Sequence, residues 1–493
     1  MSRDCIQFIR QGRVLRLRGF APRTTLLDWL RLEERSTGTK EACAEGDCGA
    51  CTVVLARRCG DRIAYEPVNS CIAFLGQIDG TELITIEDLA RDGTLHPVQA
   101  ALAAGHGSQC GFCTPGIVMS LFAYYHRVSG TPSRETINDV LAGNLCRCTG
   151  YRPIVEAALE SLAGPAADRF TAAEPQRLAM LRDLDDGADV FVGDETSFFA
   201  APKSEDALAA LLERHPDATI VAGATDVGLW VTKKLAALPK IIHLGRVLGL
   251  DGVEETDATL TLGASLPLGR AAPRLGSLDP DIEELLRRFG SVQVRTSGTV
   301  GGNIANGSPI GDLAPVLIAL GASVELRKGE RVRTLPVEKF FVSYGKQDRE
   351  AGEYVRRLVV PKPAPDARLR VMKITKRMDE DISAVMGAFA VTVTDGRVAA
   401  ARIAFGGMAG VPKRASAVEQ ALAGAQIADP ATWHAAADKI SDDFTPLTDQ
   451  RGSAAYRLQV AKNLVVKALA EIAGVPGAAT RVRPRQERAR VAS

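Results

Sequence analysis

The chain has 493 residues, of which 46% are hydrophobic and 24% charged, and its formal net charge is +1. This is the composition of a globular protein, and the length predicts about three or four domains. The balanced charge gives no reason to expect nucleic acid or a membrane surface as a partner. Because we find neither a signal-peptide h-region nor an apolar run of about 18 residues, we expect a cytoplasmic protein.

Residues 1–92 are predicted to form a small α+β domain. Apolar residues alternate with polar ones on both sides of Gln11-Gly12, and this pattern is typical of a β-hairpin. The expected elements are this hairpin at 6–18, a short amphipathic helix at 26–32 and strands near 52–55 and 83–86. Their order suits a small sheet that clasps one helix.

Four cysteines of this domain predict a 2Fe–2S cluster. Cys43, Cys48 and Cys51 follow the C-x4-C-x2-C spacing of plant-type ferredoxins, and Cys71 is the expected fourth ligand. Glycines in the loop 43–51 let the backbone turn tightly and aim N–H groups at a negatively charged cluster. Structural zinc is usually held by two CxxC-like knuckles, so this crowded loop fits zinc poorly.

Residues 93–163 are predicted to form a four-helix domain with a second group of cysteines. Apolar residues recur at helical spacing over 97–104, 115–128, 133–142 and 153–162. The cysteines form a CxxC and a CxC that are 32 residues apart: Cys110, Cys113, Cys146 and Cys148. A CxxC also occurs in zinc and redox sites, so the spacing alone leaves a cluster and these alternatives open. The six histidines show no metal-ligand spacing, and we expect them to be structural.

The segment 164–187 has no clear periodicity and is predicted to be a surface linker. The next region, 188–365, is predicted to be α/β, and it contains two glycine-rich stretches, at 222–228 and 296–306. Neither matches the GxGxxG fingerprint, and either one alone is more often a plain turn. Downstream of two one-electron centres, the pair predicts a flavin site, because a flavin exchanges both one and two electrons.

Residues 366–478 are predicted to form a last α+β domain. Asp395-Gly396 separates two apolar alternating runs and predicts a two-residue hairpin. Amphipathic helices are expected at 411–425 and 452–473. The basic end, 479–493, is expected to be a disordered tail.

Three short segments carry a resemblance to a known family. Residues 45–51, 109–116 and 144–151 are similar to the cluster signatures of the xanthine oxidase family of molybdenum hydroxylases, and 296–315 resembles that family's FAD domain. The resemblance implies a multidomain α+β protein: a β-grasp ferredoxin-like domain, a four-helix 2Fe–2S domain, an α/β FAD-binding domain of the vanillyl-alcohol-oxidase/molybdopterin-dehydrogenase type and an α+β C-terminal flavoprotein domain. It also favours a cluster on the second cysteine group.

The arrangement resembles the small subunit of bacterial xanthine dehydrogenase. The resemblance implies that a molybdopterin cofactor and the purine pocket lie on a separate large subunit, in a dimer of heterodimers. Electrons from hypoxanthine or xanthine would pass through both clusters to FAD and then to NAD, and no residue of this chain would catalyse the hydroxylation itself. An aldehyde, nicotinate or other heterocycle hydroxylase would use the same part, and a non-enzymatic redox or scaffold protein stays open as an alternative.

The family's binding residues carry over to matching positions of this sequence. Gln109 is expected near the partner's pterin, Tyr344 near the approach of NAD, and 376–381 near the flavin, with Met378 where the family often has a basic residue. The expected FAD contacts are Val221, Ala222, Gly223, Ala224, Thr225, Asp226, Val227, Gly228, Phe289, Thr299, Gly301, Gly302, Asn303, Asp312, Val355 and Lys373. Without the resemblance, Phe289 reads as a core residue, Asp312 as a helix cap and Lys373 as a solvated side chain.

Overall fold

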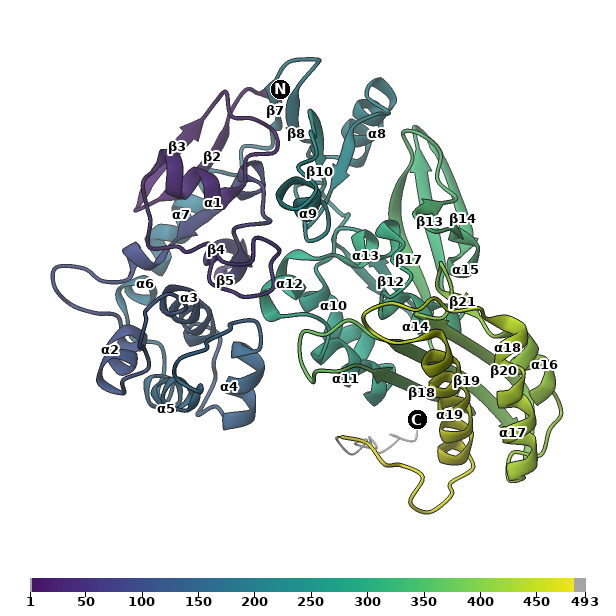
Figure 1. Cartoon of the computed structure of the whole chain (residues 1–493). Coiled ribbons are helices and arrows are strands. Elements are labelled where there is room, and N and C mark those ends of the chain that lie inside the picture. Colours follow the sequence, from purple (N-terminus) through teal and green to yellow (C-terminus); the bar gives the residue numbers. More distant parts are fainter. Residues whose placement is uncertain (1, 483–493) are drawn as a thin grey trace. The chain divides into compact units, whose positions relative to one another are not determined.

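The computed structural model describes residues 2–482 and divides into two compact units. The first unit contains the residues up to 248 together with 290–298, and the second contains 249–289 and the residues from 299 onward. Figure 1 shows the chain coloured along its sequence. The expected multidomain α+β fold is confirmed.

The first unit begins with a five-stranded sheet that clasps a short helix. The strands lie in the order β3 (Arg13–Leu17), β2 (Ile6–Arg10), β6 (Glu82–Ile84), β4 (Thr52–Cys59) and β5 (Arg62–Asn69). The predicted hairpin is β2–β3, with Phe8 opposite Leu15. The helix α1 (Leu26–Asp28), capped by Thr25, continues as a π-helical turn η1 (Trp29–Glu33), and Trp29 packs edge-on against Phe8. Two short 3-10 turns, η2 (Leu75–Ile78) and η3 (Ile86–Asp88), complete this domain.

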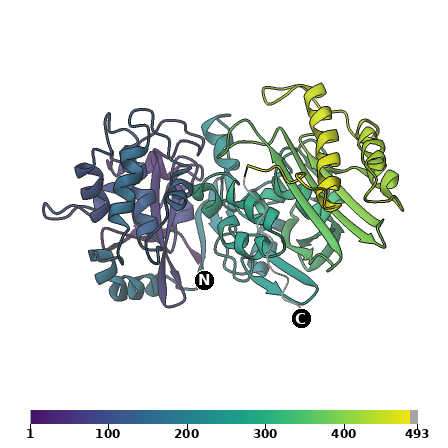
Figure 2. The ribbon, with the colours of Figure 1, turned by 90° about the horizontal axis from the view of Figure 1, so that it is seen from below.

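The four predicted helices follow as α2 (Pro97–Ala104), α3 (Thr114–Tyr125), α4 (Arg134–Leu141) and α5 (Arg152–Ser161). Proline occupies the first turn of α2, α3 and α5, where its missing N–H has no helical partner to lose. Helix α3 is buried on nearly all sides because it packs against β4 and β5 as well as against its neighbouring helices. Figure 2 shows these helices, in blue, from below.

The segment 164–187 is not the featureless surface linker that we expected. It contains α6 (Arg169–Ala172) and α7 (Glu174–Asp183), and α7 packs on β4 and β5. The buried face of α7 includes Arg177, whose guanidinium donates to Glu82 at 2.8 Å and to the Tyr65 hydroxyl at 2.5 Å. A charged residue at a buried position breaks the apolar periodicity, and this is why the sequence pattern missed the helix.

A second five-stranded sheet closes the first unit. Its order is β1 (Ser2–Arg3), β7 (Asp189–Gly193), β8 (Phe198–Ala201), β10 (Lys240–His243) and β9 (Thr219–Val221). Helices α8 (Glu205–Arg214) and α9 (Val227–Thr232) connect its strands in sequence, whereas α12 (Val292–Ser297) packs on β5 of the first sheet. Because β1 pairs in parallel with β7, the N-terminus of the chain is an edge strand of a sheet formed by residues 189–243.

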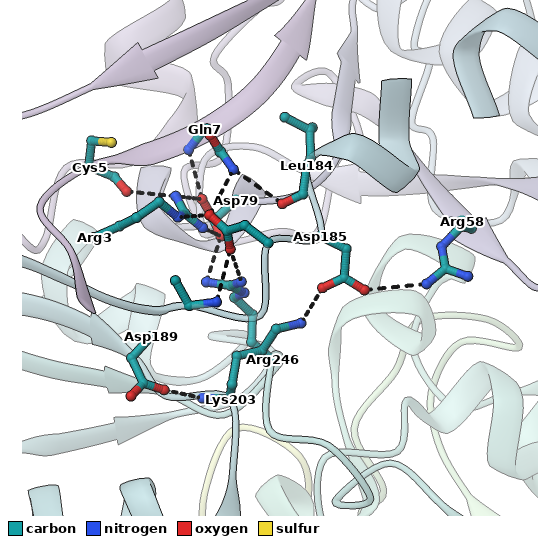
Figure 3. A network of polar contacts seen from close by, with 12 residues as sticks. Arg3, Cys5, Gln7, Arg58, Asp79, Leu184, Asp185, Asp189, Lys203 and Arg246 are labelled. Atoms are coloured by element: carbon teal, nitrogen blue, oxygen red, sulfur yellow. Dashed lines mark hydrogen bonds and ion pairs between the residues drawn. The ribbon is translucent and has the colours of Figure 1, made fainter. Parts of the chain in front are cut away.

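An ion network fastens β1 in place (Figure 3). The Asp79 carboxylate, which is 1% exposed, pairs at 3.0 Å with both Arg3 and Arg246 and accepts the Gln7 backbone N–H at 2.7 Å. Beside it, Asp185 joins Lys203 to Arg58. These contacts connect the two sheets of the first unit.

The second unit contains a five-stranded sheet, a four-stranded sheet and a two-stranded ribbon. The first has the order β11 (Val253–Glu255), β12 (Thr259–Gly263), β17 (Tyr354–Pro361), β13 (Ser323–Lys328) and β14 (Arg331–Pro336), with the ribbon β15 (Phe341–Ser343) and β16 (Lys346–Gln347) beyond it. Five helices belong to this part of the chain: α10 (Leu268–Gly276), α11 (Pro280–Arg287), α13 (Val300–Asn306), α14 (Leu313–Ala319) and α15 (Val337–Phe340). Helices α13 and α15 pack on this sheet, whereas α11 and α14 pack on the second sheet of the unit.

The second sheet of this unit has the order β18 (Ala367–Ile374), β19 (Val385–Thr394), β20 (Arg397–Gly406) and β21 (Lys413–Arg414). The predicted hairpin turns at Asp395-Gly396, whose φ angles of 50° and 75° are those of a type I′ turn. Helices α16 (Ser416–Leu422), α17 (Pro430–Asp438), α18 (Ile440–Asp443) and α19 (Ala454–Ile472) follow, and α19 packs on β18 and β19.

At the end of the described residues, Arg481 pairs with Glu471 at 2.7 Å and with Asp281 at 2.8 Å. The rest of the predicted basic tail, 483–493, lies outside the described residues. Among the helices from residue 2 to 482, none combines the length and the apolar character that crossing a bilayer requires.

Candidate redox centres

The loop from Cys43 to Cys51 is wound so that backbone N–H groups face a sulfur atom. Cys43 Sγ accepts from the Glu45 N–H at 3.5 Å and from the Cys48 N–H at 3.4 Å. Gly46 and Gly49 have φ angles of 78° and 69°, which favour glycine, and they supply the turns that this geometry needs. Such donors stabilise the negative charge of a thiolate-bound cluster.

The four predicted ligands of the first group come together. Hydrogen bonds join Cys43 to Cys48, Cys43 to Cys71, and Cys51 to Cys71. The bonds from Cys48 and Cys71 hold the pKa of the Cys43 thiol far below its usual range, whereas the same contacts raise the pKa of both partners. Four sulfurs that share protons in this way have the proximity and the chemistry to bind one 2Fe–2S cluster, with Cys51 and Cys71 buried and Cys43 and Cys48 half-buried.

The second group is also assembled by the fold. Hydrogen bonds join Cys110 to Cys148 and Cys113 to Cys146, which closes the gap of 32 residues between the two pairs. Burial, followed by the contact with Cys146, raises the pKa of the Cys113 thiol to about 12. Cys110 and Cys148 are exposed, so this group lies at the surface of the first unit, unlike the first group.

The loops that carry the two groups touch each other. The Leu145 N–H, one residue before Cys146, donates to the Cys48 carbonyl at 3.0 Å. The Asn144 amide donates to the Gly49 carbonyl at 3.2 Å. A Cβ on Gly49 would overlap the carbonyl oxygen of Gly143, and a Cβ on Gly116 would overlap that of Gly49. The two candidate clusters are therefore held by loops in direct contact.

Two histidines and an aspartate form a buried group that the sequence pattern did not reveal. Asp168 Oδ2 lies 2.9 Å from His96 Nε2 and 3.3 Å from His126 Nε2. Three such side chains suit a metal ion, but His96 Nδ1 accepts the Val98 N–H, so Nε2 of the neutral ring carries the proton. A metal-bound histidine normally donates through its other nitrogen. We conclude that Asp168 has a structural role, because it links the start of α6 to α2 and α3 through the two histidines.

The first glycine-rich stretch, Val221 to Gly228, follows β9 and leads into α9. A Cβ on Gly223 would overlap the Ser297 carbonyl, and Ala224 adopts the left-handed φ of 60°, where glycine is the usual residue. Gly228 is pressed against the backbone of Ile72, next to Cys71, which is a predicted cluster ligand. The end of this glycine-rich stretch therefore packs against the chain segment that contains Cys71, a member of the first cysteine group.

The residue that follows helix α9 also contacts the first cysteine group. The ammonium of Lys233, just beyond α9, donates to the Cys43 carbonyl at 2.5 Å and lies 3.5 Å from Glu45. Lys233 was not among the expected site residues, because a lysine after a short helix carries no recognisable signal in one sequence.

The remaining FAD candidates lie in the second unit. Thr299 caps α13 by accepting the Gly302 N–H at 3.0 Å, and a Cβ on Gly301 would overlap Ala264. The Asp312 side chain makes no cap bond and instead accepts from Lys373 Nζ at 2.6 Å and Ser383 Oγ at 2.5 Å. The plain expectations for Asp312 and Lys373, a cap and a solvated lysine, are therefore wrong.

The other predicted residues have ordinary surroundings. Val355 is buried opposite Leu326 in the sheet, Phe289 is half-buried, and Tyr344 is 77% exposed in the turn between β15 and β16. Gln109 is exposed beside Cys110. Met378 is 51% exposed within the loop 376–381, where Arg377 and Lys376 donate backbone N–H groups to Asp381.

Three family descriptions match consecutive parts of the chain. Residues 85–159 match a 2Fe–2S binding domain, 194–363 the FAD binding domain in molybdopterin dehydrogenase, and 370–472 the CO dehydrogenase flavoprotein C-terminal domain. Among curated proteins, the xanthine dehydrogenase of Emericella nidulans is 30% identical over 93% of this chain. The xanthine dehydrogenase/oxidase of Rattus norvegicus is 31% identical over 83% of it.

The chain is homologous to xanthine dehydrogenases and carbon monoxide dehydrogenases of the molybdenum hydroxylase family. It spans 38% and 34% of the length of these two curated relatives. Among solved structures, a chain of carbon monoxide dehydrogenase from Hydrogenophaga pseudoflava has a TM-score of 0.52 and 28% identity, over 55% of this chain and 95% of that one. Quinoline 2-oxidoreductase from Pseudomonas putida 86 gives 0.52 and 26%, over 57% and 98%. This molybdenum hydroxylase homologue thus contains 2Fe–2S and FAD-binding domains, as predicted.

Proposed function

We propose that this chain is the electron-transfer part of a xanthine dehydrogenase. In this proposal it takes electrons from a molybdenum centre, relays them through two 2Fe–2S clusters to FAD, and delivers them to NAD during the oxidation of hypoxanthine and xanthine to urate. The observation that carries the proposal is the pair of four-cysteine groups on touching loops. The curated relatives support the choice of substrate class, because proteins named xanthine dehydrogenase match up to 93% of the chain.

The cysteines suit the clusters assigned to them. Cys43, Cys48, Cys51 and Cys71 would hold one cluster, and Cys110, Cys113, Cys146 and Cys148 the other. The clusters supply one-electron chemistry, and FAD joins it to the two-electron chemistry of NAD. The residues of this chain fix the ligand geometry: Glu45 and Cys48 donate backbone N–H groups to a sulfur, and Leu145 joins the loops through the Cys48 carbonyl.

The flavin assignment rests on the matched FAD-binding domain, 194–363. Within it and just beyond it, we assign the FAD contacts to the stretch 221–228, to 299–303, and to Phe289, Asp312, Val355 and Lys373. The glycine packing at Gly223 and Gly301 keeps side chains away from the backbone, which suits a bound dinucleotide. The exposed Tyr344 is assigned to the approach of NAD.

A large molybdopterin-binding subunit is the proposed partner, in a dimer of heterodimers. The exposed position of Cys110 and Cys148 suits a group that receives electrons from another polypeptide, and Gln109 beside them is assigned to the pterin side. In the solved carbon monoxide dehydrogenase, one polypeptide matches 55% of this chain over 95% of its own length, so that polypeptide has little beyond the matched part. That division of labour supports a separate subunit for the molybdenum centre.

The test is to purify the tagged chain from its own organism under anaerobic conditions. We expect a large molybdenum-containing polypeptide to copurify, about four irons and one FAD per chain, and NAD reduction driven by xanthine. Turnover of quinoline, nicotinate, an aldehyde or carbon monoxide without turnover of xanthine would contradict the assignment of xanthine as the substrate. A colourless protein without iron would contradict the electron-transfer role itself.

Heterocycle hydroxylation is the second candidate. It is favoured by the likeness to quinoline 2-oxidoreductase, which is 26% identical in the matched region. The same purified complex discriminates between the two candidates, because each predicts a different substrate that reduces the chain's flavin.

A further inference from the structure

Gln293 belongs in sequence to the flavin half of the chain but lies in the unit that carries the cysteines. Its helix, α12, is part of the segment 290–298, which groups with the first compact unit rather than with its chain neighbours. The side chain is 1% exposed. A long polar side chain at such a buried position needs partners, because an unpaired amide in the interior is costly.

The partners of Gln293 come from the elements that carry the cluster ligands. Its Nε2 lies 3.2 Å from Thr52 Oγ1, 3.1 Å from Ser120 Oγ and 3.2 Å from Asn144 Oδ1. Thr52 follows the ligand Cys51 directly, and Asn144 precedes the ligand Cys146 by two residues. Ser120 lies on α3, which begins directly after the ligand Cys113. One amide group therefore touches segments of both cysteine groups.

The shape of the site is matched to this residue. A Cβ on Gly143 would overlap Gln293 Oε1 and the Cβ of Ser291, so the chain before Cys146 is pressed against α12. Ser291 is fully buried, and its hydroxyl caps α12 by accepting the Val294 N–H at 3.1 Å. The Gln293 amide group has two hydrogens to donate and three acceptor oxygens within reach. It can donate to all of them only while these three oxygens stay close together.

We infer that Gln293 is a positioning residue that fixes the separation and orientation of the two cluster sites. The inference rests on the proposed function, since it assumes that both cysteine groups carry clusters. The loops also meet directly, at Gly49, Asn144 and Leu145. Gln293 adds to these contacts, because it ties Thr52 to Asn144 through a group that is contributed by neither iron–sulfur domain.

The test uses electron paramagnetic resonance of the full-length holoprotein. When both clusters are reduced, their magnetic interaction splits the signals, and the splitting varies steeply with the distance between them. Gln293→Met keeps the length of the side chain but removes both donors, so we expect a changed splitting at unchanged iron content. Gln459→Met, at an exposed glutamine on α19, is the matched control and should keep the wild-type spectrum.

A second variant keeps the test decisive if Gln293→Met does not fold. Ser120→Ala removes one of the three acceptors and leaves the amide in place, so we expect a smaller change of the splitting in the same direction. Wild-type splitting in a fully iron-loaded Gln293→Met protein, or in Ser120→Ala if only that variant folds, would overturn the inference. Absence of cluster signals from the wild-type protein would instead contradict the proposed function.

Discussion

His243 is a buried histidine that should make the stability of the first unit depend on pH. It ends β10, is 7% exposed, and packs so closely on the chain that a Cβ on Gly245 would approach its ring. Burial, assisted by the positive charges of Arg57 and Arg246, lowers its pKa to about 3 from an ordinary value of 6.5. The folded state therefore keeps the ring neutral at a pH where the unfolded chain binds a proton.

The sign of the effect follows from proton binding. Above pH 6.5 neither state binds the proton, and the contribution of His243 is constant. As the pH falls from 6.5 towards 3, the unfolded state gains protons first and the free energy of unfolding decreases, by about 2 kcal/mol at pH 5. We expect His243→Gln to remove this part of the loss between pH 7 and pH 5, measured by thermal unfolding. His434→Gln, at an exposed histidine, is the control, and equal slopes for both variants would contradict the assignment.

Lys233 should tune the first cluster through its charge. Its ammonium is bound to the Cys43 carbonyl, so a positive charge lies beside the ligands. A nearby cation favours the more negative, reduced state of a cluster. We expect Lys233→Met to lower the midpoint potential of this cluster by an amount on the order of tens of millivolts, because the side chain is partly exposed and screened by salt.

The measurement is a potentiometric titration followed by electron paramagnetic resonance, which observes the two clusters separately. Lys234→Met removes the same charge one residue further along the chain and is the matched control. A potential that moves equally in both variants would show a general charge effect rather than the contact with Cys43.

At the scale of elements, the buried carboxylate of Asp79 strengthens the attachment of the edge strand β1, which also pairs with β7 and contacts Asp186 through Arg3. Asp79 holds two arginines and a backbone N–H at a site where its side chain is 1% exposed (Figure 3). Asp79→Asn keeps the shape but removes the buried counter-charge of Arg3 and Arg246 and leaves them the partly exposed Asp186. Loss of one partner of a buried ion pair typically costs about 3–5 kcal/mol. Thermal unfolding should show a large decrease in the midpoint temperature.

The control for this variant is an exposed ion pair of the same chemistry. Asp4 lies 3.0 Å from Arg18, with 75% and 61% of the two side chains exposed, and such surface pairs contribute little. Asp4→Asn should therefore leave the unfolding temperature almost unchanged. Similar losses in both variants would mean that burial does not decide the strength of the Asp79 network.

Gly116 tests the contact between the loops of the two cysteine groups. It lies in the first turn of α3, where alanine would ordinarily stabilise a helix by roughly 0.5–1 kcal/mol. Here a Cβ would overlap the Gly49 carbonyl, which lies next to the proposed ligand Cys48. We expect Gly116→Ala to reverse the usual sign, with lower stability and less bound iron. Gly164→Ala, at a glycine with open space around it, should retain full iron content, and full iron in both variants would contradict the packing argument.

For the molecule as a whole, elements that depend on neighbouring residues were predictable from the sequence, and contacts between residues far apart in sequence were not. Cysteine spacing, the Asp395-Gly396 turn and the proline-started helices are encoded within a few residues, and the structure contains these elements where the sequence placed them. Helix α7 was missed because the charged Arg177, which pairs with Glu82, occupies a buried position and interrupts the apolar pattern of Leu178 and Leu181. The His126 partner of Asp168 is 42 residues away in sequence, and the Thr52 partner of Gln293 is 241 residues away. A periodic pattern of apolar residues gives no information about contacts between residues so far apart.

The two glycine-rich stretches illustrate the same limit. Both were found from composition, yet 222–228 belongs to the first compact unit and 299–306 to the second. The chain passes from the first unit to the second at 248–249, returns for 290–298, and leaves again. Only the fold shows that a segment of the flavin half is buried among the cysteine domains, because that placement depends on the complementarity of surfaces and not on local pattern.

The division into two units predicts that losing iron has a regional effect. In metal sites of this kind, binding energy contributes directly to folding, and each predicted cluster would join segments that are far apart in sequence. We expect removal of iron by an anaerobic chelator to increase backbone deuterium exchange in peptides covering 43–71 and 110–151. Peptides from β19 and β20, in the core of the second unit, should keep their protection and serve as the internal control. An increase spread evenly over both units would show that the clusters stabilise the molecule as one cooperative body, and no increase around the cysteines would show that the loops are held by protein contacts alone.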